Sequence, residues 1–260
     1  MRTAIVQTNP VFGDLEGNIS QALSLMSMVP ADLYVLPELF ATCYNFLNAA
    51  ETSAFAEEPQ GRTFQRMHDF AKVRQCHLVY GFAEKADKIY NSAALVGPNG
   101  LVGVYRKVHL YAKENELFSP GNFGFPVFDL PIGKIGIMIC FDWVYPESAR
   151  TLAINGAQII AHPSNLVMPY CPDAMVTRCL ENRIFAATAN RIGAEDRGGL
   201  NLRYIGNSEI VSPNGEILVR LHEDECKAAA MDIDVSAANN KKINPYNDLL
   251  AGRREDQYSK

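Results

Sequence analysis

The feature that most constrains the fold is an internal similarity between two halves of the chain. Residues 31–38 (ADLYVLPE) and residues 157–164 (AQIIAHPS) each predict a short apolar strand that runs into a proline. In both halves, an apolar strand and a helix-like stretch come before this segment, and a second helix-like stretch and another strand follow it. Strands that alternate with helices in this way indicate βαβ units and an α/β fold.

The two halves can be aligned element by element. For the first half we expect strand 4–7, helix 18–29, helix 63–75 and strand 77–84, and for the second half strand 134–140, helix 146–155, helix 172–183 and strand 184–191. Each half then closes with a hairpin whose turn contains Pro-Asn-Gly, at 98–100 and at 213–215. Because Asn and Gly tolerate positive φ, this tripeptide between two apolar runs predicts a tight turn.

Two similar βαβ halves predict two sheets packed face to face with helices outside each sheet, which is a four-layer α-β-β-α sandwich. A single doubly wound sheet is the alternative, but no GxGxxG motif follows the first strand to support a dinucleotide site. With 48% apolar residues, the chain can form one large domain over residues 1–260. The tail from about 236 to 260 departs from the pattern, so we expect it either to dock on a partner subunit or to fray.

Charge and composition exclude several classes of function. The net charge of -5 provides no basic surface for nucleic acid or for an anionic membrane. No run approaches the roughly 20 apolar residues of a membrane-spanning helix, and the N-terminus has a strand pattern instead of a signal peptide, so we expect a cytoplasmic protein. The six cysteines form no CxxC pair and no zinc pattern, and a disulfide framework has little support in such a chain.

Cys140 stands where a nucleophile could act. Residues 134–140 (KIGIMIC) predict a strand, and residues 146–150 (PESAR) predict the start of a helix with proline in its first turn. Cys140 therefore lies at the carboxyl end of a strand, where α/β sheets bind ligands. A sharp turn there can expose the thiol, and nearby N–H groups stabilise an oxyanion. A buried structural cysteine is the alternative, and position alone favours it.

Two ionisable residues occupy comparable places. Glu38 follows the apolar run 33–37, and a carboxylate in a dry pocket can act as a general base. Lys107 ends the strand of the first hairpin and could stabilise a tetrahedral oxyanion. An exposed loop glutamate and a solvated basic edge are the alternatives, so neither residue is decisive by itself.

Together, three segments resemble the signature motifs of the nitrilase superfamily of carbon–nitrogen hydrolases. They are residues 37–39 (PEL), 105–110 (YRKVHL) and 139–147 (ICFDWVYPE), in the family's order and at its approximate spacing. Further agreement extends to 91–92 (NS), 119–121 (SPG), 162–166 (HPSNL), 180–183 (LENR) and 189–191 (ANR). The resemblance covers nearly the whole chain, and three separated motifs in register are far more specific than one. It implies the four-layer sandwich predicted above.

The resemblance also implies a role for each motif residue. Glu38 is expected to be the general base and Cys140 the nucleophile that attacks the substrate carbon. Lys107 and the backbone N–H of Phe141 are expected to stabilise the resulting charge. A thioester would then form and be hydrolysed by water that Glu38 activates. The resemblance implies no metal and no organic cofactor.

The family often adds a second glutamate ahead of the Pro-Gly pair. Glu114 fits the spacing of acylamidases and carbamoylases, whereas Glu116 fits that of aliphatic amidases, and we expect Glu114. The family places the following residues at the mouth of the site: Tyr44, Asn45, Phe46, Trp143, Tyr145, Asn165 and residues up to Tyr170. Ordinary aromatic packing is the alternative, above all for Tyr44 and Phe46. Arg178 could meet a substrate carboxylate, but an ion pair with Glu181 is the safer expectation.

Two substrate classes remain possible, an amide-type compound and a nitrile. Phe141-Asp142 favours a small amide or N-carbamoyl compound, because nitrilases proper usually have Trp-Glu at these positions. Some similar prokaryotic enzymes with Cys-Phe-Asp-Trp have nevertheless been assigned as nitrilases on small aliphatic nitriles. A catalytically silent scaffold is a hypothesis of another class, against which the presence of all three motif residues argues. The resemblance further implies a small-molecule substrate and a homodimer or higher homo-oligomer.

Overall fold

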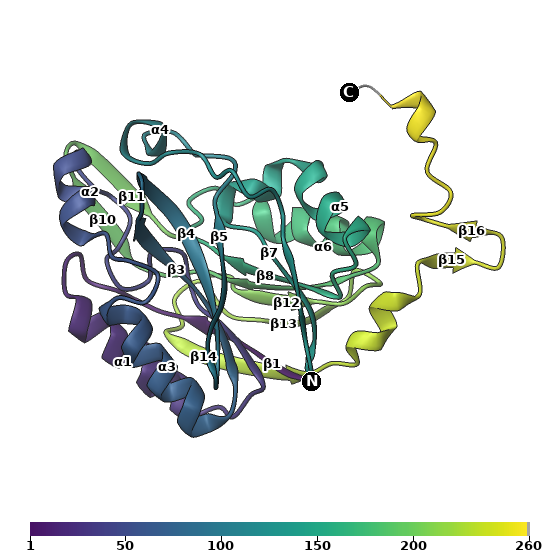
Figure 1. The fold of residues 1–260 in the computed structure, drawn as a ribbon, viewed down its shortest axis with the longest axis horizontal. Helices are drawn as coiled ribbons and strands as arrows, with labels where there is room; N and C mark the ends of the chain where they lie inside the picture. The colour runs from purple at the N-terminus through teal and green to yellow at the C-terminus, as the bar shows by residue number, and fades with distance from the viewer. Residues whose placement is uncertain (259–260) are drawn as a thin grey trace.

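Two mixed six-stranded sheets form the centre of the protein, which a computed structural model describes from residue 1 to residue 258. The first sheet contains β1 (Arg2–Gln7), β2 (Leu33–Val35), β3 (His77–Lys85), β4 (Ile89–Gly97), β5 (Gly100–Arg106) and β14 (Lys227–Asp232). The second sheet contains β6 (Val127–Leu130), β7 (Gly133–Ile137), β8 (Ile159–Pro163), β9 (Phe185–Ala189), β12 (Glu209–Val211) and β13 (Ile217–Arg220). Their strand orders are β14-β1-β2-β3-β4-β5 and β13-β12-β9-β8-β7-β6 (Figure 1).

The pairing within the two sheets confirms the repeat. β1, β2 and β3 are parallel neighbours, and β4 and β5 continue the sheet antiparallel. In the same way β7, β8 and β9 are parallel, and β12 and β13 continue antiparallel. The first sheet is completed by a strand from the other half, because β14 pairs with β1. The second sheet is completed by β6, which directly precedes β7 in the sequence and forms a hairpin with it. The alternative of a single doubly wound sheet is therefore wrong.

Alternating residues of the strands face the space between the sheets and the outer face of each sheet. In β2, Leu33 and Val35 belong to the cluster between the sheets, whereas Tyr34 belongs to the cluster on the outer face. This alternation is expected because successive strand residues point to opposite faces. Leu33 and Val35 share the inner cluster with Ile137 and Ile159 of the second sheet. The sheets thus pack face to face around an apolar interior.

Helices cover both outer faces and complete the predicted four-layer sandwich (Figure 1). They are α1 (Leu15–Ser27) and α3 (Arg62–Arg74) on the first sheet, and α5 (Pro146–Ile154) and α6 (Cys171–Asn182) on the second. The strands and helices agree with the expected ranges to within a few residues. The largest shifts are at α1, which begins three residues earlier than expected, and at β7 (Gly133–Ile137), which ends three residues earlier, so that Cys140 lies beyond the strand in a 3-10 helix. Asp14 caps this helix by accepting a hydrogen bond from the Gly17 N–H.

Two helices and a hairpin that were not predicted are found away from the layers in Figure 1. They are α2 (Ala49–Phe55), α4 (Glu114–Leu117) and the hairpin of β10 (Ala194–Arg197) and β11 (Leu200–Arg203). The hairpin lies between β9 and β12, where the first half has only a short turn between β3 and β4. No helix in the described part of the chain combines the length and apolar character that crossing a membrane requires.

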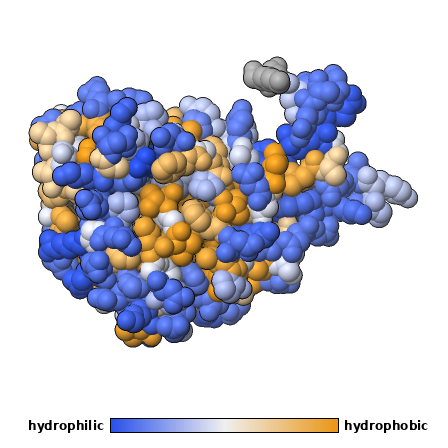
Figure 2. Space-filling model, in the orientation of Figure 1, coloured by the Kyte–Doolittle hydropathy of each residue, from blue (hydrophilic) through white to orange (hydrophobic). Residues whose placement is uncertain are grey.

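The C-terminal tail leaves the sandwich. It contains a 3-10 helix (Val235–Asn239) and the small hairpin of β15 (Lys242–Asn244) and β16 (Asn247–Asp248), and it projects from the body (Figure 1). It is largely hydrophilic, in contrast to the apolar centre of the neighbouring face (Figure 2). Lys241 fastens its base by donating to two carbonyl oxygens at the end of α6. Residues 259–260 of the expected tail lie outside the described residues.

Candidate active site

The ends of three strands bring Glu38, Lys107 and Cys140 to one buried place. Glu38 follows β2, Lys107 follows β5, and Cys140 begins the 3-10 helix Cys140–Val144 that comes after β7. The Lys107 Nζ lies 2.7 Å from Glu38 Oε1, and both side chains are fully buried. The charges of Glu38 and Lys107 both act on the Cys140 thiol. The structure therefore brings together the three residues that the motifs singled out.

Glu38 is held by its surroundings while one of its oxygens stays free. Its Oε1 accepts hydrogen bonds from Lys107 Nζ and Asn91 Nδ2, each at 2.7 Å. Its carbonyl oxygen accepts from Asn165 Nδ2 at 2.8 Å. Its Oε2 is buried and accepts no hydrogen bond from the described residues. A buried carboxylate oxygen without a donor is costly, which marks this atom as one with a chemical task.

The second glutamate of the site is Glu114, which lies in α4. Its Oε1 accepts from Lys107 Nζ at 2.7 Å and from the Tyr44 hydroxyl at 2.5 Å, and its Oε2 accepts from the Tyr111 N–H at 3.3 Å. Glu116, the competing choice, is exposed. Glu114 therefore binds the Lys107 ammonium, and Tyr44 binds Glu114.

Charges within the site set its protonation states. Burial lowers the pKa of Lys107, but the carboxylates of Glu114 and Glu38 outweigh burial and raise it, so the ammonium persists. Burial raises the pKa of the Cys140 thiol well above its ordinary value, and the charge of Glu38 raises it further. The positive charge of Lys107 lowers the pKa of Cys140, but by less than burial and Glu38 raise it. The Cys140 side chain is therefore a protonated thiol, and forming its thiolate requires a base.

The backbone at Cys140 adopts a conformation that few non-glycine residues tolerate. Its φ is +40°, which costs on the order of 1–3 kcal/mol and has to be stabilised by the surroundings. Burial lowers the pKa of His162 to about 4, so its ring is neutral. The ring donates through Nε2 to the Cys140 carbonyl oxygen at 3.0 Å, and its Nδ1 accepts from the Thr188 hydroxyl at 3.1 Å.

Asp142 joins the cysteine turn to the lysine segment. This buried carboxylate accepts from the Ile139 N–H at 2.9 Å, from the Tyr105 hydroxyl at 2.7 Å and from the His109 N–H at 3.1 Å. Tyr105 and His109 flank Lys107 at a distance of two residues on either side. The carboxylate thereby fixes the relative position of Cys140 and Lys107.

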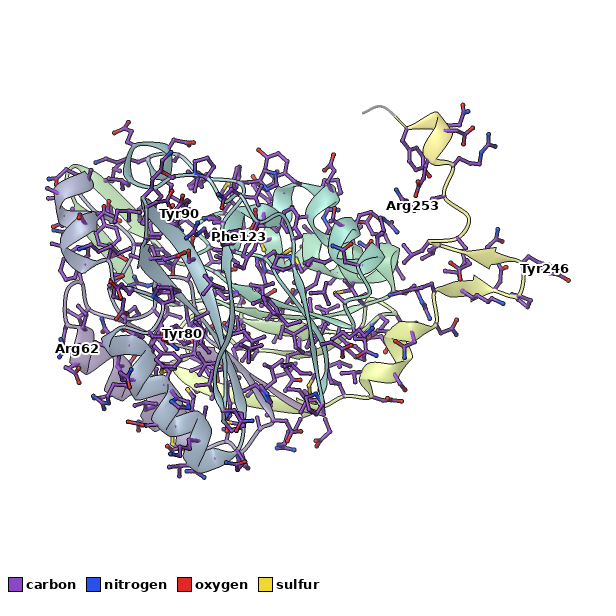
Figure 3. The ribbon with its side chains drawn as sticks, viewed as in Figure 1. Arg62, Tyr80, Tyr90, Phe123, Tyr246 and Arg253 are labelled. Carbon is purple, nitrogen blue, oxygen red and sulfur yellow. The ribbon has the colours of Figure 1, made fainter. Side chains whose placement is uncertain are left out.

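Arg106 anchors the end of β5 next to the lysine. It forms an ion pair with the buried carboxylate of Glu84 at 2.6 Å. Its guanidinium carbon lies 3.8 Å from the ring centroid of Tyr90 and 4.5 Å from that of Phe123, and both rings are labelled in Figure 3. This packing restrains the backbone from which Lys107 reaches the site.

A small cavity, with about 10 Å³ of free space, lies at the cysteine. Its lining consists of Tyr111, Cys140, Phe141, Trp143, Asn165, Leu166, Val167 and Met168. Phe141, Trp143 and Asn165 therefore lie where they were expected. No carboxylate, lysine, arginine or histidine belongs to this lining.

Other residues expected at the mouth have different surroundings. Tyr44 does not line the cavity, and its hydroxyl donates a hydrogen bond to Glu114. Tyr145 stacks on the ring of His109 with 3.8 Å between centroids, and it does not line the cavity. Phe46 is fully buried in an aromatic cluster, which is the ordinary packing considered as its alternative. The expected ion pair between Arg178 and Glu181 is confirmed at 3.1 Å.

Several functional neighbours had no clear signal in the sequence. Tyr111 lines the cavity, but it lies in a loop without periodicity. Asn91 and His162 fall in segments that resemble the family, yet the resemblance carried no role for them. The carboxylate of Asp142 was used only as a clue to the substrate.

Comparisons with known proteins agree with this geometry. Residues 2–242 match the family described as carbon–nitrogen hydrolase. The chain is 47% identical to a nitrilase of Pyrococcus abyssi, with 99% of each chain covered, and 33% identical to an (R)-stereoselective amidase of Pseudomonas sp, with 100% of this chain and 90% of the relative covered. The crystal structure of an amidase from Nesterenkonia sp. superposes with a TM-score of 0.81 at 26% identity, covering 98% of this chain and 94% of that chain. The chain belongs to the family of carbon–nitrogen hydrolases.

Proposed function

We propose that this carbon–nitrogen hydrolase cleaves a small aliphatic amide or N-carbamoyl compound through a thioester on Cys140. The observation that carries the proposal is the convergence of a protonated thiol, a carboxylate with a free oxygen and a buried ammonium. These are the parts that nucleophilic catalysis at a carbonyl carbon requires.

In the first half of the proposed reaction, Glu38 Oε2 takes the proton of the Cys140 thiol as the sulfur bonds to the carbonyl carbon. The carbonyl oxygen becomes an oxyanion. Collapse of this intermediate breaks the carbon–nitrogen bond, and the nitrogen leaves as ammonia or an amine with the proton from Glu38. An acyl thioester of Cys140 remains. A carboxylate thereby does the work that histidine does in many other hydrolases.

In the second half, Glu38 accepts a proton from water while the water oxygen bonds to the thioester carbon. Collapse of the second tetrahedral intermediate breaks the carbon–sulfur bond. The sulfur regains its proton from Glu38, and the acid leaves. The free enzyme is restored without a change of oxidation state.

Lys107 is the proposed electrostatic stabiliser in both halves. Two of its three N–H groups are directed to Glu38 and Glu114, which leaves the third for the substrate oxygen. The backbone N–H of Phe141 stands at the start of the 3-10 helix, where N–H groups have no helical acceptor. Preorganised donors of this kind are typically worth about 3–4 kcal/mol of transition-state stabilisation each.

The cavity supports a small substrate without a charge. Pockets for drug-sized ligands span about 300–1,000 Å³, whereas the free space at Cys140 is only about 10 Å³. Its lining has no cationic side chain to pair with a distal carboxylate. Arg178, the one candidate for that task, donates instead to Glu181 and to the carbonyl oxygen of Trp143.

Hydrolysis of a small aliphatic nitrile is the second candidate, favoured by the nitrilase of Pyrococcus abyssi that is 47% identical. Sulfur would add to the nitrile carbon to give a thioimidate. One water would then release ammonia and leave the same thioester, and a second water would release the acid.

A screen for ammonia and acid release across small amides, N-carbamoyl compounds and nitriles tests the proposal. We expect uncharged short-chain amides to be hydrolysed fastest. Turnover of nitriles alone would favour the second candidate, and ammonia release that persists in Cys140→Ala would overturn both.

We further propose that the enzyme assembles as a homodimer or larger homo-oligomer with the tail docked on a second copy. Apolar side chains of the tail are exposed, with Ile243 at 54% and Tyr246 at 93% of their full accessibility. Tyr246 stands at the tip of the projecting hairpin, as Figure 3 shows. Docking would remove this surface from water.

A further inference from the structure

The two halves of the fold differ at one position that bears on the active site. Between β3 and β4 the chain makes a short turn, whereas between β9 and β12 it inserts the β10–β11 hairpin. This hairpin reaches across to the first half, to the loop that follows Glu38. Asn45 Nδ2 donates to the carbonyl oxygens of Arg197 and Leu200, and Arg197 donates back to the Asn45 carbonyl oxygen at 2.9 Å.

Glu195 of the hairpin makes the strongest of these contacts. Its carboxylate accepts from the Asn45 N–H at 2.8 Å and from the Tyr44 N–H at 3.2 Å. It also accepts from the Tyr204 hydroxyl at 2.9 Å and forms an ion pair with Arg191. The side chains of Glu195 and Arg191 are almost fully buried, with 4% and 2% exposed. Buried charges that are paired and fully hydrogen-bonded hold their neighbours tightly, because breaking such a pair leaves a charge uncompensated.

The contact with Tyr44 continues into the catalytic residues. The backbone of Tyr44 is bound by Glu195, and its hydroxyl donates to Glu114 Oε1 at 2.5 Å. The same oxygen accepts from Lys107 Nζ at 2.7 Å. A displacement of the Tyr44 backbone would remove this hydroxyl from Glu114 and loosen the restraint on the ammonium.

We propose that Glu195 is a positioning residue that acts on the active site through Tyr44, and that the inserted hairpin serves to hold it there. The inference rests on the proposed function, since it assumes that Lys107 must be placed for hydrolysis. Glu195 lies outside the cavity and touches neither the cysteine nor the lining. Glu195 must therefore act on Lys107 through the loop that carries Tyr44.

A double-mutant cycle with Glu195→Gln and Tyr44→Phe tests the inference. Each single substitution is expected to lower kcat by about 10- to 100-fold with little change in KM, because a shift of about 1 Å near the chemistry can cost about 100-fold. The double variant is expected to lose no more than Tyr44→Phe alone, since residues that act through one path are not additive.

Glu209→Gln is the matched control. Glu209 is also a buried carboxylate paired with an arginine, with Arg220 at 2.7 Å, but it lies in β12 away from the Tyr44 loop. Its substitution is expected to leave kcat unchanged. Should Glu195→Gln fail to fold, Glu195→Asp keeps the charge beside Arg191 while its shorter side chain withdraws from the Tyr44 N–H, and the same loss of kcat is expected.

Two outcomes would overturn the inference: a wild-type kcat in the Glu195 variants, or losses that multiply fully in the double variant. Failure of the proposed function would look different, because the wild-type enzyme would then release no acid from any substrate screened. In that case the cycle is read from the rate at which iodoacetamide alkylates Cys140. The same non-additivity is expected there, and independent effects would contradict the inference.

Discussion

Gly81 is the residue whose replacement tests most sharply how Glu38, the proposed general base, is placed. It lies in β3, directly against the main chain at Glu38. A Cβ at this position would stand 2.5 Å from Glu38 Cα and 2.6 Å from the Leu39 nitrogen. Carbon atoms in contact prefer about 3.5–4.0 Å. Gly81→Ala therefore has to push the two backbones apart by about 1 Å.

Gly81 is held in β3 by the pairing of that strand with β4, whereas Glu38 lies beyond the end of β2, so the Glu38 segment is the part that has to move. The Leu36 N–H donates to the Val79 carbonyl oxygen at 2.8 Å, and the Gly81 N–H donates to the Pro37 carbonyl oxygen at 3.1 Å. We expect a shift of about 1 Å at Glu38 to lower kcat/KM by about 100-fold, which is about 2.7 kcal/mol of transition-state stabilisation. Overpacking should also destabilise the fold by about 1–3 kcal/mol.

Steady-state kinetics on the best amide of the screen, with thermal unfolding in parallel, measures both effects. Gly97→Ala is the control, because its Cβ meets the ring of His77 at 2.9 Å, and His77 is the first residue of β3, beside Leu33 at the start of β2 and away from Glu38. That variant should lose some stability and keep its kcat/KM. Wild-type kinetics in a folded Gly81→Ala variant would refute the claim that close backbone approach positions Glu38.

Four further outcomes follow from the site and the tail. Cys140→Ala should abolish turnover while circular dichroism shows an unchanged fold, and activity near the wild-type level would end its assignment as nucleophile. Glu38→Gln should suppress the acylation burst in rapid-quench kinetics, whereas a normal burst would remove Glu38 as the base. Burial lowers the pKa of His162 from 6.5 to about 4, so its contribution to stability is complete above pH 6.5 and is lost as pH falls toward 4. The melting temperature of His162→Gln should therefore depend less on pH between 6.5 and 4 than that of the wild type. An unchanged pH dependence would count against a neutral buried ring. Removing residues 236–260 should convert the oligomer to monomer in light scattering, and an unchanged mass would refute docking of the tail.

The architecture could be predicted from the sequence because both sheets follow from local patterns that occur twice. Apolar strands that alternate with helices, and two Pro-Asn-Gly turns, were sufficient to predict two similar halves and their layers. Boundaries shifted where side-chain caps decide them, as at Asp14. The pairing of the edge strand β14 with β1 could not be predicted, since it joins opposite ends of the chain and no local pattern encodes such a contact.

The candidate site was predictable to the extent that its residues sit at strand ends in recognisable motifs. Glu38, Lys107, Cys140 and Glu114 lie together as expected. The supporting carboxylate of Glu195 was not foreseen, because the hairpin that carries it is rich in charged and polar residues and resembles a surface loop. Its burial arises only from the partners that surround it in the folded chain, above all Arg191.

The proposed reaction depends on a covalent bond between the substrate's acyl group and Cys140. Acid-quenching the enzyme during turnover of a small amide, followed by mass analysis of its peptides, tests this claim most directly. We expect the mass of the acyl group on the peptide that contains Cys140, and a larger amount of it when deacylation is slowed. An acyl group on another residue, or undiminished turnover by Cys140→Ala, would contradict the account.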